Sequence, residues 1–185
     1  MVKIGTVDSA PAATPVYFDS ALIAKFYVNE PGREAVRAVA KRAGIVVTSG
    51  IAVAEISAAF HRKFREGAVD SDVFKALRGQ FQHDLSSGLW RLIAPTEALL
   101  EEVRALFSRL DKSVFLRALD GLHLVTAKAE GFQRIYSNDR HLLSATASVG
   151  LEGVNPISES RPDIPSGLPF QIRKKTPRTK TTPQK

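Results

Sequence analysis

Short apolar runs alternate with longer amphipathic stretches along most of this chain. The apolar runs have strand length and lie at residues 16–18, 45–48, 89–93, 134–137 and near 154. Between them, apolar spacing predicts helices over about 20–29, 31–42, 51–65, 70–85, 96–109, 114–130 and after 139. Strand–helix alternation of this kind favours an α/β domain with a central, mostly parallel sheet covered by helices on both faces.

Capping residues set the predicted helix boundaries. Ser20 is expected to cap the helix that follows the first strand, and Asp70 or Ser71 to cap a later one. Pro31 suits the first turn of the second helix, and Gly44 is expected to end it.

Composition narrows the class of protein. The chain has 185 residues, of which 44% are apolar and 24% charged, as in an ordinary soluble domain. It has no cysteine, which excludes disulfides, thiolate zinc sites and cysteine nucleophiles. Charges interrupt every hydrophobic stretch before it reaches the length of a membrane span, and the first residues lack the apolar core of a signal peptide. We therefore expect a cytoplasmic protein without membrane association.

Charge is concentrated at the C-terminus and suggests three segments. Residues 158–185 hold seven basic and two acidic residues, so +5 of the net charge of +7 lies there and +2 remains for residues 1–157. The same stretch has five prolines, so we expect a disordered basic tail that is either a solubilising extension or attracts nucleic acid. Residues 1–14 are expected to form a flexible extension, and residues 15–157 the folded domain.

Four carboxylates lie at positions that are not expected to be exposed to solvent. Asp19 and Asp139 follow the strands over 16–18 and 134–137, at carboxyl ends where functional groups gather in α/β sheets. Glu55 and Asp120 project from apolar helix faces.

Buried carboxylates need a cation, a proton or a metal ion, and the sequence offers few cations nearby. Arg62 is the best structural partner for Glu55, whereas Arg117 is expected on another helix face than Asp120. A cluster of acids without cations favours Mg²⁺ or Mn²⁺, with four unrelated buried acids as the structural alternative. If the acids converge, repulsion should raise at least one of their pKa values above about 4.

Four segments in order resemble the PIN domain, and most closely VapC-type toxins of type II toxin–antitoxin pairs. They read VYFDSALIAKFYV, TSGIAVAEISAAFHR, LRALDGLHLVTA and IYSNDRHLLSAT, and the resemblance covers residues 16–156. It implies that Asp19, Glu55, Asp120 and Asp139 are the metal-binding, catalytic acids, with Ser137 at a supporting position. It also implies a Mg²⁺- or Mn²⁺-dependent endoribonuclease that acts on RNA, pairs with a small antitoxin and forms a homodimer.

Other features leave alternatives open. The N-terminal extension and the basic tail depart from the family pattern and bear on partner and substrate. Lys25, Arg62 and Arg140 are candidate phosphate contacts, although surface roles also fit them. His123 and His141 are expected to pack or form hydrogen bonds, because Mg²⁺ prefers oxygen ligands. A non-catalytic RNA-binding module is one alternative. A haloacid-dehalogenase-like phosphatase with Asp19 as nucleophile is weaker, because the second acid expected at position 21 is alanine.

Overall fold

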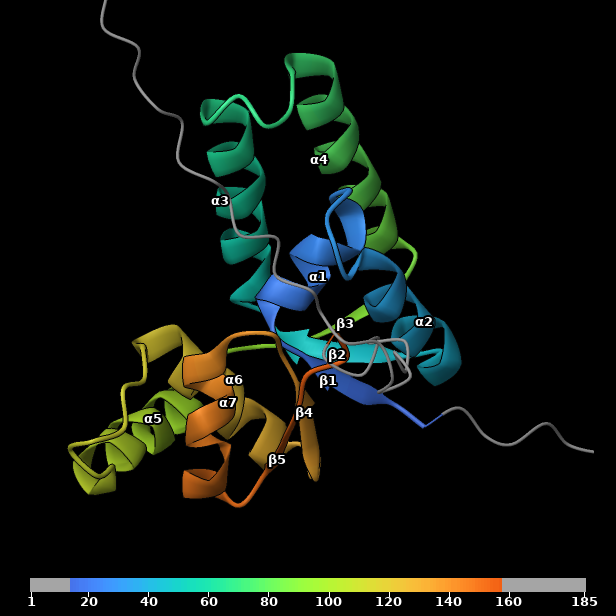
Figure 1. Ribbon diagram of the computed structural model, residues 1–185. Coiled ribbons are helices and arrows are strands. Elements are labelled where there is room, and N and C mark those ends of the chain that lie inside the picture. The colour runs from blue at the N-terminus through green and yellow to red at the C-terminus, as the bar shows by residue number, and fades with distance from the viewer. Residues whose placement is uncertain (1–13, 158–185) are drawn as a thin grey trace, which may run out of the picture.

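A five-stranded parallel sheet in the order β3-β2-β1-β4-β5 forms the centre of the computed structural model, which describes residues 14–157 (Figure 1). The strands are β1 (Val16–Phe18), β2 (Val46–Ser49), β3 (Trp90–Ile93), β4 (Arg134–Tyr136) and β5 (Glu152–Val154). The helices are α1 (Ser20–Tyr27), α2 (Arg33–Ala43), α3 (Ala52–Arg65), α4 (Ser71–Ser86), α5 (Glu97–Arg109), α6 (Ala118–Ala129), α7 (Arg140–Ala145) and the short 3₁₀ helix η1 (Thr146–Val149).

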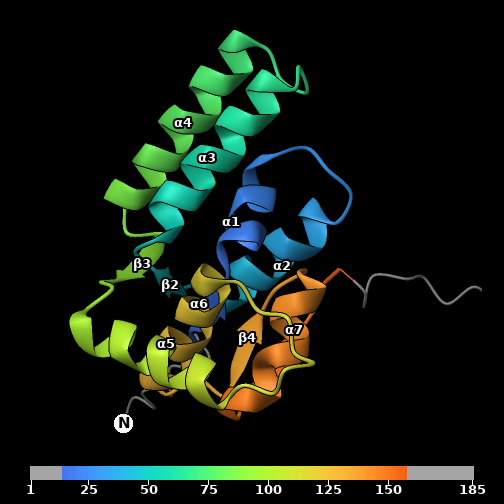
Figure 2. The ribbon, with the colours of Figure 1, turned by 90° about the vertical axis from the view of Figure 1, so that its left-hand side faces the viewer.

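Alternation along the strands divides the core into two layers. Phe18 and Val46 point to one face, where they pack with buried side chains of α1, α2 and α3. Tyr17, Val47 and Ile135 point to the other face and pack against α5, α6 and α7. Figures 1 and 2 show these two helical layers on opposite sides of the sheet, with α3 and α4 extending away from it as a long pair. The α/β architecture expected from the sequence is therefore confirmed.

A network of polar side chains connects α4 with the end of α1 and with β3. The Tyr27 hydroxyl donates to Asp84 Oδ2 at 2.7 Å and accepts a hydrogen bond from Trp90 Nε1 at 2.6 Å. Gln80 Nε2 donates to Asp84 Oδ1 at 2.8 Å. Asp84 is only 7% exposed, and the sequence analysis did not single it out.

The predicted cap of the first helix and the predicted start of the helix at residue 114 are wrong, and both bear on the candidate site. Asp19, not Ser20, caps α1, because its Oδ1 accepts a hydrogen bond from the Leu22 N–H at 2.9 Å. The helix expected from residue 114 begins at Ala118, since Arg117 before it has extended backbone (φ −85°, ψ 155°). Pro31 also lies outside the helix whose first turn it was expected to occupy, because Gly32 is the N-cap of α2. Other boundaries fall within a few residues of the prediction, and Gly44 ends α2 with a φ of 71°, as expected.

The predicted terminal segments fall almost entirely outside the described residues. The N-terminal extension includes only residue 14 of the described part, and the basic tail over 158–185 lies beyond it. Within residues 14–157, no helix has the length and apolar character needed to cross a membrane.

Candidate active site

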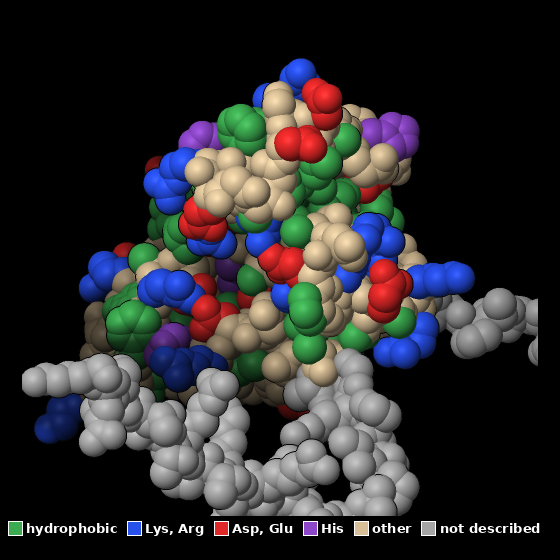
Figure 3. Space-filling model, turned by 45° about the horizontal axis from the view of Figure 1, so that its top comes forward, with side chains coloured by type: hydrophobic (Ala, Val, Ile, Leu, Met, Phe, Trp, Pro, Cys, Tyr) green, Lys and Arg blue, Asp and Glu red, His purple; other side chains and the backbone are tan. Residues whose placement is uncertain are grey.

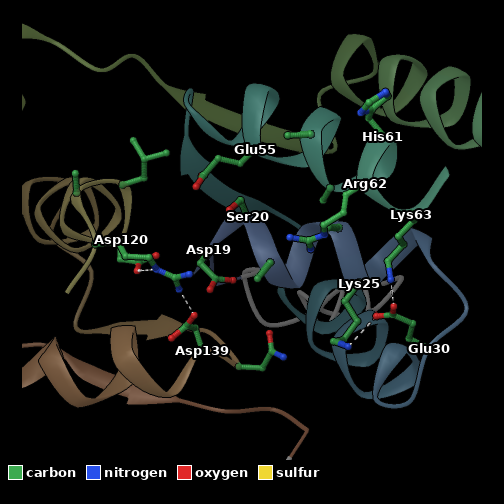
Figure 4. Close-up of a pocket in the computed structure, with 18 of the residues that line it drawn as sticks. Asp19, Ser20, Lys25, Glu30, Glu55, His61, Arg62, Lys63, Asp120 and Asp139 are labelled. Carbon is green, nitrogen blue, oxygen red and sulfur yellow. Dashed lines mark hydrogen bonds and ion pairs between the residues drawn. The ribbon is translucent and has the colours of Figure 1, made fainter. Parts of the chain in front are cut away.

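Asp19, Glu55, Asp120 and Asp139 all line one cavity of about 830 Å³ at the carboxyl end of the sheet (Figure 4). Parallel pairing of β1 with β4 brings the residues that follow these strands together, and the Asp19 N–H donates to the Tyr136 carbonyl at 3.1 Å. Glu55 comes from α3 and Asp120 from the first turn of α6. Acids separated by up to 120 residues in the chain thus face the same space.

Asp19 is the most buried of the four acids, at 3% exposure. Its Oδ1 caps α1, and its Oδ2 accepts a hydrogen bond from the Ser137 hydroxyl. Burial raises the pKa of Asp19 to about 6, against the lowering effect of Ser137, the Leu22 N–H and His123, with a small further rise from Asp120. A raised pKa was expected, but its main cause is burial and not repulsion between acids.

Asp139 is held by backbone groups and by Ser137. Its Oδ1 caps α7 by accepting from the N–H groups of His141 at 2.7 Å and Leu142 at 3.3 Å. The Ser137 hydroxyl, which donates to Asp19, also accepts from the Asp139 N–H at 2.9 Å. Burial would raise the pKa of Asp139, but these backbone donors and Arg117 together hold it below its usual range. Ser137 therefore positions both strand-end acids at once.

Glu55 pairs with His123, not with Arg62 as the sequence suggested. His123 is buried on α6, and its Nε2 lies 3.0 Å from Glu55 Oε2, while its Nδ1 forms a hydrogen bond with the Tyr17 hydroxyl at 3.2 Å. Burial raises the pKa of Glu55, but hydrogen bonds from His123 and Ser20 and the charges of His123 and Arg117 outweigh it, so that the pKa is lowered. The hydrogen-bonding role expected for His123 is confirmed.

Arg117 bridges the other two acids, contrary to the prediction that it lies on a different face from Asp120. Its Nε donates to Asp120 Oδ2 at 2.8 Å, and its Nη2 donates to Asp139 Oδ2 (dashed lines in Figure 4). Arg117 and Asp120 are three positions apart, a spacing that brings side chains together on a helix, so the contact was compatible with the predicted helix and the assignment to another face was wrong. The contact with Asp139, 22 positions away, depends on the fold.

Basic side chains line the other end of the cavity. Lys25 and Lys63 both pair with Glu30, whereas Arg62 forms no ion pair with any carboxylate among residues 14–157. Arg140, also a candidate phosphate contact, does not line the cavity. Neither Glu30 nor Lys63 was among the candidate residues drawn from the sequence. Figure 3 shows acidic and basic side chains interspersed on one face of the protein.

The chemistry of the donors fits a hard divalent cation. Carboxylate and hydroxyl oxygens surround the acidic end of the cavity, and such oxygens are the ligands that Mg²⁺ and Mn²⁺ prefer. As the side chains stand, however, no three His, Asp or Glu groups among residues 14–157 are arranged to hold a metal ion. In this arrangement the Arg117 guanidinium pairs with both Asp120 and Asp139.

Comparisons with known proteins place this site in context. The family model of the PIN domain matches residues 16–148. VapC20 of Mycobacterium tuberculosis, described as a sarcin–ricin loop cleaving toxin, has a similar structure, with a TM-score of 0.55 and 16% identity over 70% of this chain and 94% of its own. FitAcB from Neisseria gonorrhoeae is similar with a TM-score of 0.56 and 18% identity, over 76% of this chain and 97% of the other. No curated protein sequence matches this chain significantly.

Proposed function

This chain belongs to the PIN-domain family, and we propose that it is a divalent-metal-dependent endoribonuclease. The observation that carries the proposal is the convergence of four carboxylates from four separate elements on one cavity. A carboxylate with a purely structural role needs only one hydrogen-bonding or ion-pair partner, and a residue nearby in the chain can provide it. Four acids facing a shared space instead form the donor set of a hydrolytic metal site.

In this proposal each acid has a defined part. Asp19 and Asp120 would be the central metal ligands, and Glu55 and Asp139 would complete the set, directly or through water. When bound, Mg²⁺ or Mn²⁺ supplies the charge that binds a phosphate, lowers the pKa of an attacking water and stabilises the leaving oxygen.

The chain's own groups hold these acids ready. The Ser137 hydroxyl donates to the Asp19 carboxylate and accepts from the Asp139 backbone N–H, and the N-termini of α1 and α7 fix one carboxylate oxygen of each acid. His123, held by Tyr17, orients Glu55. Such support keeps ligands within the narrow geometry that catalysis requires.

The basic end of the cavity supports RNA as substrate. Arg62 and Lys25 line the same cavity as the acids, so a phosphate backbone could extend from the acids along α3. Residues 15–157 would be the nuclease domain, and the basic tail over 158–185 would add affinity for a polyanion without sequence preference.

We place the nuclease in a toxin–antitoxin pair, acting as the toxin, binding a small antitoxin and forming a homodimer. The similarity in fold to VapC20 and to FitAcB supports this setting. A non-catalytic RNA-binding module is the second candidate, because no three His, Asp or Glu groups among residues 14–157 are arranged to hold a metal ion as the side chains stand. The family match leaves the phosphatase alternative without support.

RNA cleavage by the full chain tests the proposal. We expect cleavage of mixed RNAs with Mg²⁺ or Mn²⁺, none in excess EDTA, and a loss of about 10³-fold or more in Asp120→Asn, because metal catalysis is worth several kcal/mol. Asp72→Asn is the control, since it removes the same charge from an exposed pair with Lys75. Cleavage that persists in excess EDTA would contradict the metal-dependent mechanism, and metal binding without cleavage would favour the non-catalytic alternative.

A further inference from the structure

The Arg117 guanidinium bridges two of the proposed metal ligands. It donates to Asp120 and to Asp139. Two of the four acids are thus already paired with one side chain of the same protein. That side chain is 55% exposed, so solvent lies beside it and it has room to turn away.

Arg117 contacts the carboxylate oxygens that a metal ion would also use. Asp139 Oδ1 is occupied by the N–H groups of His141 and Leu142 at the start of α7, which leaves Oδ2 as the oxygen available to a metal ion. Arg117 holds this same Oδ2. On Asp120, Arg117 likewise holds Oδ2. A cation that uses Asp139 must therefore displace the guanidinium or share an oxygen with a second positive charge.

We propose that Arg117 is a built-in competitor of the metal ion, which neutralises the acids when the site is empty and weakens metal binding. The inference rests on the proposed metal site. In this arrangement the measured dissociation constant equals the intrinsic constant divided by the fraction of molecules in which Arg117 is disengaged. Nuclease activity would then need a higher concentration of divalent cation than it would without the arginine.

The size of the effect follows from the exposure of the pair. Exposed ion pairs are worth little singly, and a guanidinium that bridges two carboxylates is stronger than one pair. We expect Arg117→Gln to lower the dissociation constant for Mn²⁺ roughly three- to tenfold. Arg117→Lys keeps the charge but cannot span both acids with a planar fork, so its dissociation constant should fall between those of wild type and Arg117→Gln.

Calorimetric titration of the full-length, metal-free protein with Mn²⁺ alone is the test, and it needs no RNA and no activity. Arg134→Gln is the matched control, because Arg134 forms a comparable single pair with Glu152, is 59% exposed and lies outside the cavity lining. The dissociation constant of Arg134→Gln for Mn²⁺ should equal that of wild type. Melting curves give a second readout, in which saturating Mn²⁺ should raise the melting temperature more for Arg117→Gln than for wild type at equal concentration.

The outcomes separate this inference from the proposed function. Equal or weaker Mn²⁺ binding by Arg117→Gln, with wild-type binding intact, would overturn the competition and leave the metal site standing. Tighter binding by Arg117→Gln but wild-type binding by Arg117→Lys would show that charge alone acts and would overturn the bridging role. Absence of Mn²⁺ binding in all of these proteins would overturn the metal site and the inference together.

Discussion

Two aspartates are buried to nearly the same extent in this protein, and they have very different surroundings. Asp84 is 7% exposed and Asp19 is 3% exposed. Both oxygens of Asp84 accept hydrogen bonds from neutral side chains, Tyr27 and Gln80, within the packing between α4 and the sheet. Asp19 also accepts two hydrogen bonds, yet it lines a cavity that it shares with Glu55, Asp120 and Asp139.

The difference teaches that burial of a carboxylate does not by itself indicate a functional site. Asp84 is buried because it completes a network that includes Tyr27 and Trp90, and such networks specify how a core packs. Asp19 is buried beside a cavity that three other acids also line, and burial of its charge has an energetic cost. Convergence on a shared space, rather than burial, distinguishes the two.

Removing Asp84 should have the largest effect on stability. Asp84→Ala leaves the buried Tyr27 hydroxyl without its acceptor and also removes the partner of the exposed Gln80 amide, and we expect a loss of about 2 kcal/mol in the free energy of unfolding. Denaturant unfolding measures it, with Asp72→Ala as an exposed control. An effect no larger than the control's would break the comparison, since Asp84 would then not be the structural acid.

The stability effect of Asp19 should depend on pH. Its pKa rises from 3.8 when unfolded to about 6 when folded, so the folded state binds more protons in this range and loses stability as pH rises through 6. Asp19→Asn keeps a cap acceptor without the charge. In EDTA we expect wild type to lose about 1.4 kcal/mol relative to Asp19→Asn between pH 5 and pH 8.

Urea unfolding of both proteins at the two pH values measures this change. Comparison with Asp84→Asn against wild type under the same conditions tests whether a pH effect of this size is particular to the cavity. A difference between wild type and Asp19→Asn that stays constant with pH would mean that burial does not perturb the Asp19 carboxyl.

Local sequence pattern was sufficient to find the strand-end acids. Asp19 and Asp139 each stand directly after an apolar strand or two residues later, and parallel strands bring such positions to one edge. Glu55 and Asp120 were found because a charge on an apolar helix face is unusual. The α/β architecture was predicted from the alternation of short apolar runs with longer amphipathic stretches.

Contacts between distant residues could not be predicted from one sequence. Asp84 lies on a helix among other polar residues, and its partner Tyr27 is 57 positions away. His123 and Glu55 are 68 positions apart, so the choice of His123 over Arg62 depends on how α3 packs against α6. The pair of Arg117 with Asp120 was missed although a spacing of three positions brings side chains together on a helix, whereas its pair with Asp139 spans 22 positions and depends on the fold.

The central claim is that lining the shared cavity, and not burial, makes a carboxylate functional. Titration with Mn²⁺ of three proteins, wild type, Asp19→Asn and Asp84→Asn, tests this claim most directly. Titration of the metal-free proteins should give the same dissociation constant for wild type and Asp84→Asn. For Asp19→Asn the constant should be at least about tenfold weaker, because even partners of metal ligands contribute 10- to 100-fold. No Mn²⁺ binding by wild type, or equal weakening in both variants, would contradict the account.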